Sequence, residues 1–239
     1  MASLAVVGTG IRAVSQVTPE ALARIRSAER LFHGVADRVT SDWLREMNPR
    51  AETLSDLYRE GVPRRTVYDA MVERVLAAVR AGAQTCLALY GHPGVCARAG
   101  HEAVRVARSE GYRAVMLPGV SCEDCLFADL GIDPAAHGVQ SHEATLFLER
   151  EMAYDARAAV VLWQVGLLGD ADYRASYRPR GLDRLAARLA DGYGPSHRAV
   201  LYELPTYGGG PPLVEEWPLA ELPKAQIGWA STLYVPPRA

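Results

Sequence analysis

The segment of residues 87–95 constrains the fold of this chain more than any other. It begins with the apolar run Leu-Ala-Leu-Tyr and continues directly into a turn of Gly, His, Pro and Gly. Such a run, bounded by Gly and Pro, is typical of a buried strand in a parallel sheet, and open α/β sheets bind ligands beyond the carboxyl ends of their strands. Gly91 and Gly94 carry no side chains, so the backbone of the turn is able to face a ligand. The segment alone leaves an ordinary strand-to-helix connection equally open.

Short apolar runs alternate with segments of helical periodicity along the rest of the chain. The apolar runs predict strands at residues 4–7, 31–35, 114–117, 144–148, 159–163, 200–202 and 232–235. Helices are predicted over residues 19–31, 63–80, 122–130 and 182–190, around residues 101–108, and in a short segment that Thr40 is expected to cap. This alternation is typical of an α/β fold.

Composition limits both the size of the core and the class of partner. The chain has 239 residues, of which 49% are hydrophobic, enough for one large domain or two small ones. Its formal net charge is -2, and its charged residues form no basic stripe, which argues against nucleic acid and membrane surfaces as partners. The apolar N-terminal run is too short for a signal peptide or a membrane span, so we expect a cytoplasmic protein.

The four cysteines fit reduced thiols in that compartment better than a disulfide framework. Cys122 and Cys125 form the only close pair. Zinc sites use this spacing, but they need a second pair of ligands, and none of the six histidines stands at a matching distance. We therefore expect no metal site, and helix packing is favoured over redox chemistry for this pair.

A glycine-containing loop also follows the first predicted strand. Residues 8–13 match the dinucleotide fingerprint G-x-G-x-x-G/A, which suggests an NAD-dependent oxidoreductase. That fingerprint opens a helix within itself, whereas Thr18 and Pro19 predict a later helix start here, so this interpretation is the least favoured. A third loop of this kind, residues 118–121, precedes the helix that Ser121 is expected to cap.

Arg64 and Tyr68 stand four residues apart at the start of the helix predicted from residue 63. This spacing places both side chains on one face of the helix. A surface pair is the ordinary explanation of such spacing. Tyr58 and Arg65 in the same region favour a functional site instead.

Together these loops resemble those of the tetrapyrrole methylase superfamily of S-adenosylmethionine-dependent enzymes: glycines after the first strand, a Gly-x-Pro turn in mid-chain and Pro-Gly-Val-Ser further on. Within it, the chain resembles the methyltransferase domain of borosin enzymes, which methylate backbone amide nitrogens of a ribosomal peptide. The likeness covers nearly the whole chain and rests on residues 7–11, 90–95, 109–114, 116–121, 123–130, 164–166 and 231–237. His92 stands where tetrapyrrole enzymes usually carry Asp.

The resemblance implies an α/β fold of two domains, residues 1–118 and 119–239, each a sheet flanked by helices. S-adenosylmethionine would bind in the cleft between them and leave as S-adenosylhomocysteine. The resemblance implies that the first loop lines this site with Gly8 and Gly10, and that six further residues contact the cofactor: Tyr90, His92, Val95, Ser121, Cys122 and Gln164.

The resemblance also implies a homodimer and a peptide partner. Fused borosin enzymes continue past a Tyr-x-Pro-Pro end into a clasp segment and their own substrate peptide. This chain ends at residue 239, shortly after its own Tyr-Val-Pro-Pro, so we expect a split form whose precursor is a separate polypeptide.

The catalytic pattern of the family is a Tyr after a Leu, then an Arg, then a Tyr four residues later. Tyr58, Arg64 and Tyr68 fit this pattern. The interval between Tyr58 and Arg64 is shorter than in other members of the family, and it lacks a tyrosine that they carry there. Which tyrosine takes the proton therefore stays open. An amide nitrogen is a poor nucleophile because its lone pair is delocalised into the carbonyl group. Arg64 is therefore expected to bind the carbonyl oxygen as negative charge develops, while a tyrosine accepts the amide proton.

Two other functions stay open beside peptide N-methylation. One is methylation of a tetrapyrrole or another small molecule, because superfamily membership does not determine the substrate. The other is a catalytically inactive partner that only binds a peptide, which any observed methyl transfer would exclude.

Overall fold

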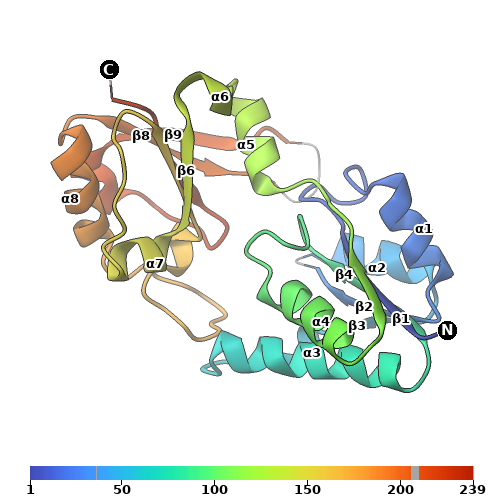
Figure 1. The fold of residues 1–239 in the computed structure, drawn as a ribbon. Coiled ribbons are helices and arrows are strands. Elements are labelled where there is room, and N and C mark those ends of the chain that lie inside the picture. Colours follow the sequence, from blue (N-terminus) through green and yellow to red (C-terminus); the bar gives the residue numbers. More distant parts are fainter. Residues whose placement is uncertain (36, 206–209, 239) are drawn as a thin grey trace. The chain divides into compact units, whose positions relative to one another are not determined.

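The computed structural model describes residues 1–35, 37–205 and 210–238 (Figure 1). These residues form two compact units. The first contains Met1–Cys125 and Gly210, and the second contains Leu126–Pro205 and the residues from Pro211 onward. Within the described ranges, no helix is long and apolar enough to cross a membrane.

The first unit is built on a sheet of five parallel strands in the order β3-β2-β4-β1-β5. The strands are β1 (Ser3–Gly8), β2 (Arg30–Gly34), β3 (Ala51–Thr53), β4 (Gln84–Leu89) and β5 (Arg113–Met116). Because all five run in the same direction, their carboxyl ends share one edge of the sheet. Every loop that follows a strand therefore begins at that edge.

Helices cover both faces of this sheet (Figure 1). They are α1 (Pro19–Ser27) and α2 (Arg38–Met47) on one face, and α3 (Arg64–Arg80) and α4 (Arg98–Ser109) on the other. Side chains alternate between the two faces of a strand, so β1 contributes Leu4 and Val6 to the core beneath α3 and α4. Its Ala5 and Val7 pack beneath α1 and α2.

The second unit has a mixed sheet in the order β6-β7-β10-β8-β9. Only β6 and β7 are parallel, and the other neighbouring strands are antiparallel. The strands are β6 (Val139–Glu143), β7 (Ala159–Trp163), β8 (Arg198–Glu203), β9 (Leu213–Pro218) and β10 (Thr232–Val235). This unit also contains α6 (Pro134–His137), α7 (Ala144–Glu149), α8 (Leu182–Tyr193) and the 3-10 turns η2 (Val165–Leu167) and η3 (Leu219–Lys224).

The expected architecture, two sheets flanked by helices, is confirmed, but three local predictions were wrong. Residues 144–148 form helix α7 and not a strand, because the Glu143 carboxylate accepts hydrogen bonds from the backbone N–H groups of Thr145 and Leu146 at 3.0 and 2.7 Å. The helix predicted over residues 19–31 ends at Ser27, and Arg30 already begins β2.

The cap of α2 is the third correction. Asp37, not Thr40, is the N-cap residue, and its carboxylate accepts a hydrogen bond from the Thr40 backbone N–H at 2.8 Å. The Thr40 hydroxyl donates a second hydrogen bond to the same carboxylate at 2.8 Å. The sequence prediction named Thr40 alone as the cap, whereas the acceptor for the first turn of α2 comes from Asp37, three residues earlier.

Candidate functional site

Three loops converge at the carboxyl edge of the first sheet. Residues 8–10 begin at the last residue of β1, residues 90–94 follow β4, and residues 118–121 follow β5. The first two loops are joined as a short antiparallel bridge, in which Gly10 and Gly91 exchange backbone hydrogen bonds of 3.3 and 2.9 Å. Thr9, which is buried, donates from its backbone N–H to the Leu89 carbonyl oxygen at 2.9 Å.

The absence of side chains at two glycines allows these loops to touch. A Cβ atom at Gly8 would lie 2.2 Å from the Gly91 carbonyl oxygen, a separation that no real contact tolerates. A Cβ atom at Gly119 would lie 3.2 Å from both that oxygen and the Gly8 Cα atom. The three backbones therefore form a single close-packed cradle whose polar groups are not covered by their own side chains.

The Gly-His-Pro-Gly turn is held by hydrogen bonds of its own. The Gly94 backbone N–H donates to Nδ1 of His92 at 3.0 Å, so the neutral His92 ring carries its proton on Nε2. Nε2 of His101, on α4, lies 2.8 Å from the Gly94 carbonyl oxygen. Tyr90 and His92 are half-buried and Val95 is exposed. These hydrogen bonds define the shape of the turn, and the side chains of Tyr90, His92 and Val95 stay at least partly accessible to a ligand.

Ser121 ends the third loop and begins α5 (Cys122–Leu130), as the sequence predicted. Its hydroxyl donates to the Asp124 carboxylate at 2.7 Å and accepts from the Asp124 backbone N–H at 3.2 Å. The Ser121 backbone N–H donates to the same carboxylate at 2.7 Å, which completes a reciprocal capping box. Cys122, the first residue of the helix, is half-buried.

Gln16 is a site residue that the sequence analysis missed. Its side-chain oxygen accepts hydrogen bonds from the backbone N–H groups of Ile11 and Arg12, both at 2.8 Å. Its side-chain nitrogen lies 3.3 Å from the Cys125 sulfur, so Gln16 ties the loop after β1 to α5. The available signal was a long amide side chain between a glycine pair and a helix cap, where backbone N–H groups need partners.

The expected catalytic residues belong to the same unit. Arg64 is the first residue of α3, Tyr68 lies one turn later, and Tyr58 follows the 3-10 turn η1 (Ser55–Leu57). All three are half-buried, and both tyrosine rings pack against the core cluster beneath α3. A helix that connects two parallel strands begins at the carboxyl edge of the sheet, so the start of α3 lies on the same edge as the glycine loops.

Gln164 lies in the second unit, at the carboxyl end of β7. Its backbone is left-handed, with φ 60° and ψ 34°, and its side chain is half-buried. The following turn is tightly packed, since a Cβ atom at Gly166 would lie 1.9 Å from the Gly228 carbonyl oxygen. A left-handed non-glycine residue is strained, and such residues often occur at functional sites.

The described residues contain no group of three or more His, Cys, Asp or Glu side chains that is able to hold a metal ion.

His33, on β2, is completely buried, and neither ring nitrogen has a hydrogen-bond partner among the described residues. Burial, with a smaller contribution from the Arg45 charge, lowers the pKa of His33 to about 4. The ring is therefore neutral at physiological pH.

The chain matches the family model of the tetrapyrrole (corrin/porphyrin) methylases over residues 3–207. It is 40% identical over 243 residues to a methyltransferase/ribosomally synthesized type I borosin cyclic peptide precursor of Coprinopsis marcescibilis, with 99% of this chain and 62% of that protein covered. It is 38% identical over 242 residues to the methyltransferase/ribosomally synthesized cyclic peptide omphalotin A precursor of Omphalotus olearius, with 99% and 58% covered. The chain thus spans about three fifths of the length of these relatives.

A similar fold occurs among solved structures. The uroporphyrin-III-C-methyltransferase of Thermus thermophilus superposes with a TM-score of 0.70 at 19% identity, with 98% of this chain and 92% of that chain covered. A diphthine synthase superposes with a TM-score of 0.63 at 17% identity, with 98% and 90% covered. At these identities the likeness concerns the fold alone.

Proposed function

Since the chain belongs to the tetrapyrrole (corrin/porphyrin) methylase family, we propose that it is an S-adenosylmethionine-dependent methyltransferase whose acceptor is the backbone amide of a ribosomally made peptide. The observation that carries this proposal is the 40% identity, across 99% of the chain, to a relative named as both a methyltransferase and a borosin peptide precursor. The glycine cradle at the carboxyl edge of the first sheet supports it.

The cradle has the chemistry that a sulfonium nucleoside requires. Backbone carbonyl and N–H groups of the loops at residues 8–10, 90–94 and 118–121 are suited to a polar nucleoside, and the half-buried ring of Tyr90 is suited to a nearby cation. We propose that the residues that contact the cofactor are Gly8, Gly10, Tyr90, His92, Val95, Ser121, Cys122 and Gln164. When bound, S-adenosylmethionine supplies an electrophilic methyl group and leaves as S-adenosylhomocysteine.

The residues at the start of α3 would activate the acceptor. Arg64 donates hydrogen bonds to the carbonyl oxygen of the target amide and stabilises the negative charge that develops there. A tyrosinate oxygen, that of Tyr68 or of Tyr58, accepts the amide proton, so that the nitrogen lone pair becomes available to the methyl group. Holding the amide at near-attack distance in a site that excludes water supplies much of the remaining rate enhancement.

We further propose that the enzyme acts as a homodimer in the cytoplasm, in a complex of two enzyme chains with precursor peptides. The names of the relatives describe proteins that combine the methyltransferase with the precursor. For this chain, the sequence-based expectation is a precursor on a separate polypeptide, and the experiment below distinguishes the two arrangements.

Peptide methylation is tested with a precursor segment from a relative. The part of the Omphalotus olearius relative that lies outside the region matched here is supplied to the chain with S-adenosylmethionine, either as a separate peptide or fused after residue 239. Mass spectrometry should show increments of one methylene group in at least one arrangement, and the arrangement that reacts identifies how the substrate is presented. An unmodified peptide in both, with S-adenosylhomocysteine binding intact, would contradict the peptide assignment.

The family description favours a second candidate, methylation of a tetrapyrrole. A parallel reaction with a uroporphyrin-III-type tetrapyrrole tests it, and methyl transfer to that substrate alone would replace the peptide proposal. An inactive peptide-binding partner is the third candidate. It predicts that peptide binds but that no methyl group is transferred to any acceptor.

A further inference from the structure

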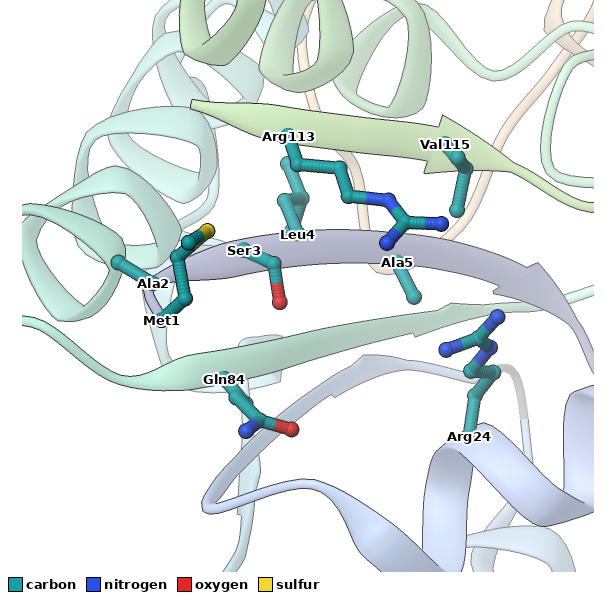
Figure 2. A pocket seen from close by; sticks show the side chains of 9 residues that line it. All are labelled: Met1, Ala2, Ser3, Leu4, Ala5, Arg24, Gln84, Arg113 and Val115. Carbon is teal, nitrogen blue, oxygen red and sulfur yellow. The ribbon is translucent and has the colours of Figure 1, made fainter. Parts of the chain in front are cut away.

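The opposite, amino-terminal edge of the first sheet holds a hollow of about 260 Å³ (Figure 2). Its floor is formed by strand residues that share one face, since Ser3 pairs with both Gln84 and Arg113, and Ala5 pairs with Val115. Ser3 and Ala5 are small, which leaves space between the longer side chains of the neighbouring strands. Arg24 of α1 closes one side. Sequence and register together thus create a hollow that the proposed methyl transfer does not use.

Two arginines reach into this hollow from different elements. Figure 2 shows the guanidinium groups of Arg24 and Arg113 both extending toward Ala5, Arg24 from α1 and Arg113 from β5. Neither side chain makes a hydrogen bond or an ion pair with any residue in the described ranges. The nearby Glu29 carboxylate accepts a hydrogen bond from the Gln84 backbone N–H at 2.7 Å, and Glu29 does not line the hollow.

The charge of Arg24 acts on the sheet beneath it. Cys86, on β4, pairs with Ala5, the residue toward which both arginines extend. Burial raises the pKa of the Cys86 thiol to about 12, and the Arg24 charge opposes that rise. The effect of Arg24 on the Cys86 pKa agrees with the direction of its side chain, since both place the Arg24 cation near the small residues of β1.

Two cations at one hollow repel each other unless an anion lies between them. One guanidinium group already satisfies both oxygens of a carboxylate, whereas a phosphate group offers enough oxygens for two guanidinium groups at once. We propose that this hollow binds the phosphate group of a small molecule between Arg24 and Arg113. The hydroxyl of Ser3 and the side-chain amide of Gln84 supply further hydrogen-bond donors.

The phosphate site is separate from the proposed methyl-transfer site. Ser3 is the first residue of β1 and Gly8 is the last, so the two edges lie about 17 Å apart along the strand. Substitution of Arg24 or Arg113 should therefore leave S-adenosylhomocysteine binding unchanged. That independence allows the phosphate proposal and the proposed function to fail separately.

The experiment is calorimetric titration of the full chain with inorganic phosphate, glycerol phosphate and acetate. Phosphate should bind with a Kd on the order of 1 mM, and Arg24→Gln or Arg113→Gln should weaken it about tenfold or more. Arg26→Gln, on the same helix but outside the hollow, is the matched control and should bind like the parent. Tighter binding of glycerol phosphate identifies an organic phosphate as the ligand, and equal binding identifies free phosphate.

A further variant tests the shape of the hollow without changing its charge. Ala5→Leu fills the floor and should abolish phosphate binding while circular dichroism shows a folded chain. The proposal would be overturned by no phosphate binding in the parent, by acetate binding as tight as phosphate, or by a loss of binding in Arg26→Gln equal to that in the two hollow variants. Parent-like binding in Arg24→Gln and Arg113→Gln would overturn it as well.

Discussion

The two sheets have the same number of strands but distribute their strand ends differently. All five strands of the first sheet are parallel, so the loops after β1, β4 and β5 and the start of α3 all occur at one edge. In the second sheet only β6 and β7 are parallel, and successive strand ends alternate between its edges. Every candidate site residue except Gln164 belongs to the first unit. Strand direction explains this concentration, because a parallel sheet gathers at one edge the backbone groups that an antiparallel sheet disperses.

The largest expected effect is on the proposed chemistry at that edge. Arg64→Ala should lower the methyl-transfer rate by about two to three orders of magnitude, because it removes a donor aimed at a developing oxyanion. Tyr68→Phe should also slow transfer while peptide binding persists. Arg80→Ala, at the exposed last position of α3, is the control and should react like the parent. If Arg64→Ala and Tyr68→Phe both react at the parent rate, Arg64 and Tyr68 are not the catalytic residues.

A methyl group at Gly8 tests the cradle itself. Gly8→Ala forces the loop backbones apart, since its Cβ atom would lie 2.2 Å from the Gly91 carbonyl oxygen. We expect S-adenosylhomocysteine affinity, measured by calorimetry, to fall at least about tenfold, and stability to fall by about 1–3 kcal/mol. Gly34→Ala is a matched control at the same edge, because its Cβ atom would meet only Leu89 Cδ2 at 3.4 Å. Equal affinity in the two variants would show that the cradle is not the cofactor site.

His33 makes the first unit sensitive to acid. Its pKa is about 4 in the folded chain against 6.5 unfolded, so between these values the unfolded chain binds the proton and the folded chain does not. The free energy of unfolding is therefore highest above pH 6.5. It decreases by on the order of 3 kcal/mol as the pH falls to about 4. Urea unfolding of the parent and of His33→Leu across this range measures the difference. An identical pH dependence in both would exclude His33 as its source.

The smallest effects concern helix caps in the two units. Ser121→Ala and Asp133→Ala each remove a cap and should lower stability by about 1 kcal/mol. Only Ser121→Ala should also weaken S-adenosylhomocysteine binding, because Ser121 belongs to the cradle and Asp133 caps α6. Thermal unfolding and calorimetry on the same two variants separate stability from binding. Weaker binding in Asp133→Ala would remove the contrast between the units.

Much of the fold was predictable because it depends on local signals. The apolar runs at β1, β4, β7 and β10 predicted their strands, and Ser121 predicted the start of α5. The prediction failed at residues 144–148, where an apolar run fits a strand and a helix equally and the Glu143 cap decided for a helix. Strand β9 escaped prediction because its residues are mostly exposed at the sheet edge, so burial leaves no alternating pattern.

The candidate site was predictable to a different degree. The glycines and the Gly-His-Pro-Gly turn predicted the loops. The contact of Gly8 with Gly91 was not predicted, because it joins residues far apart in the chain and spacing alone does not reveal such contacts. Gln16 was missed for the same reason, since its partners include the Cys125 sulfur, 109 residues away. Likewise, the hollow at Arg24 and Arg113 was not predictable from the sequence, because it depends on the register of β1 with β5.

The most direct test of the proposed methyl-transfer site is a crystal structure of the chain with S-adenosylhomocysteine. We expect the nucleoside to lie against the loops at residues 8–10, 90–94 and 118–121, with its sulfur directed toward the start of α3. A nucleoside bound elsewhere, or one bound through residues 8–13 in the manner of a dinucleotide with α3 remote from it, would contradict the claim that this edge of the parallel sheet carries the methyl-transfer site.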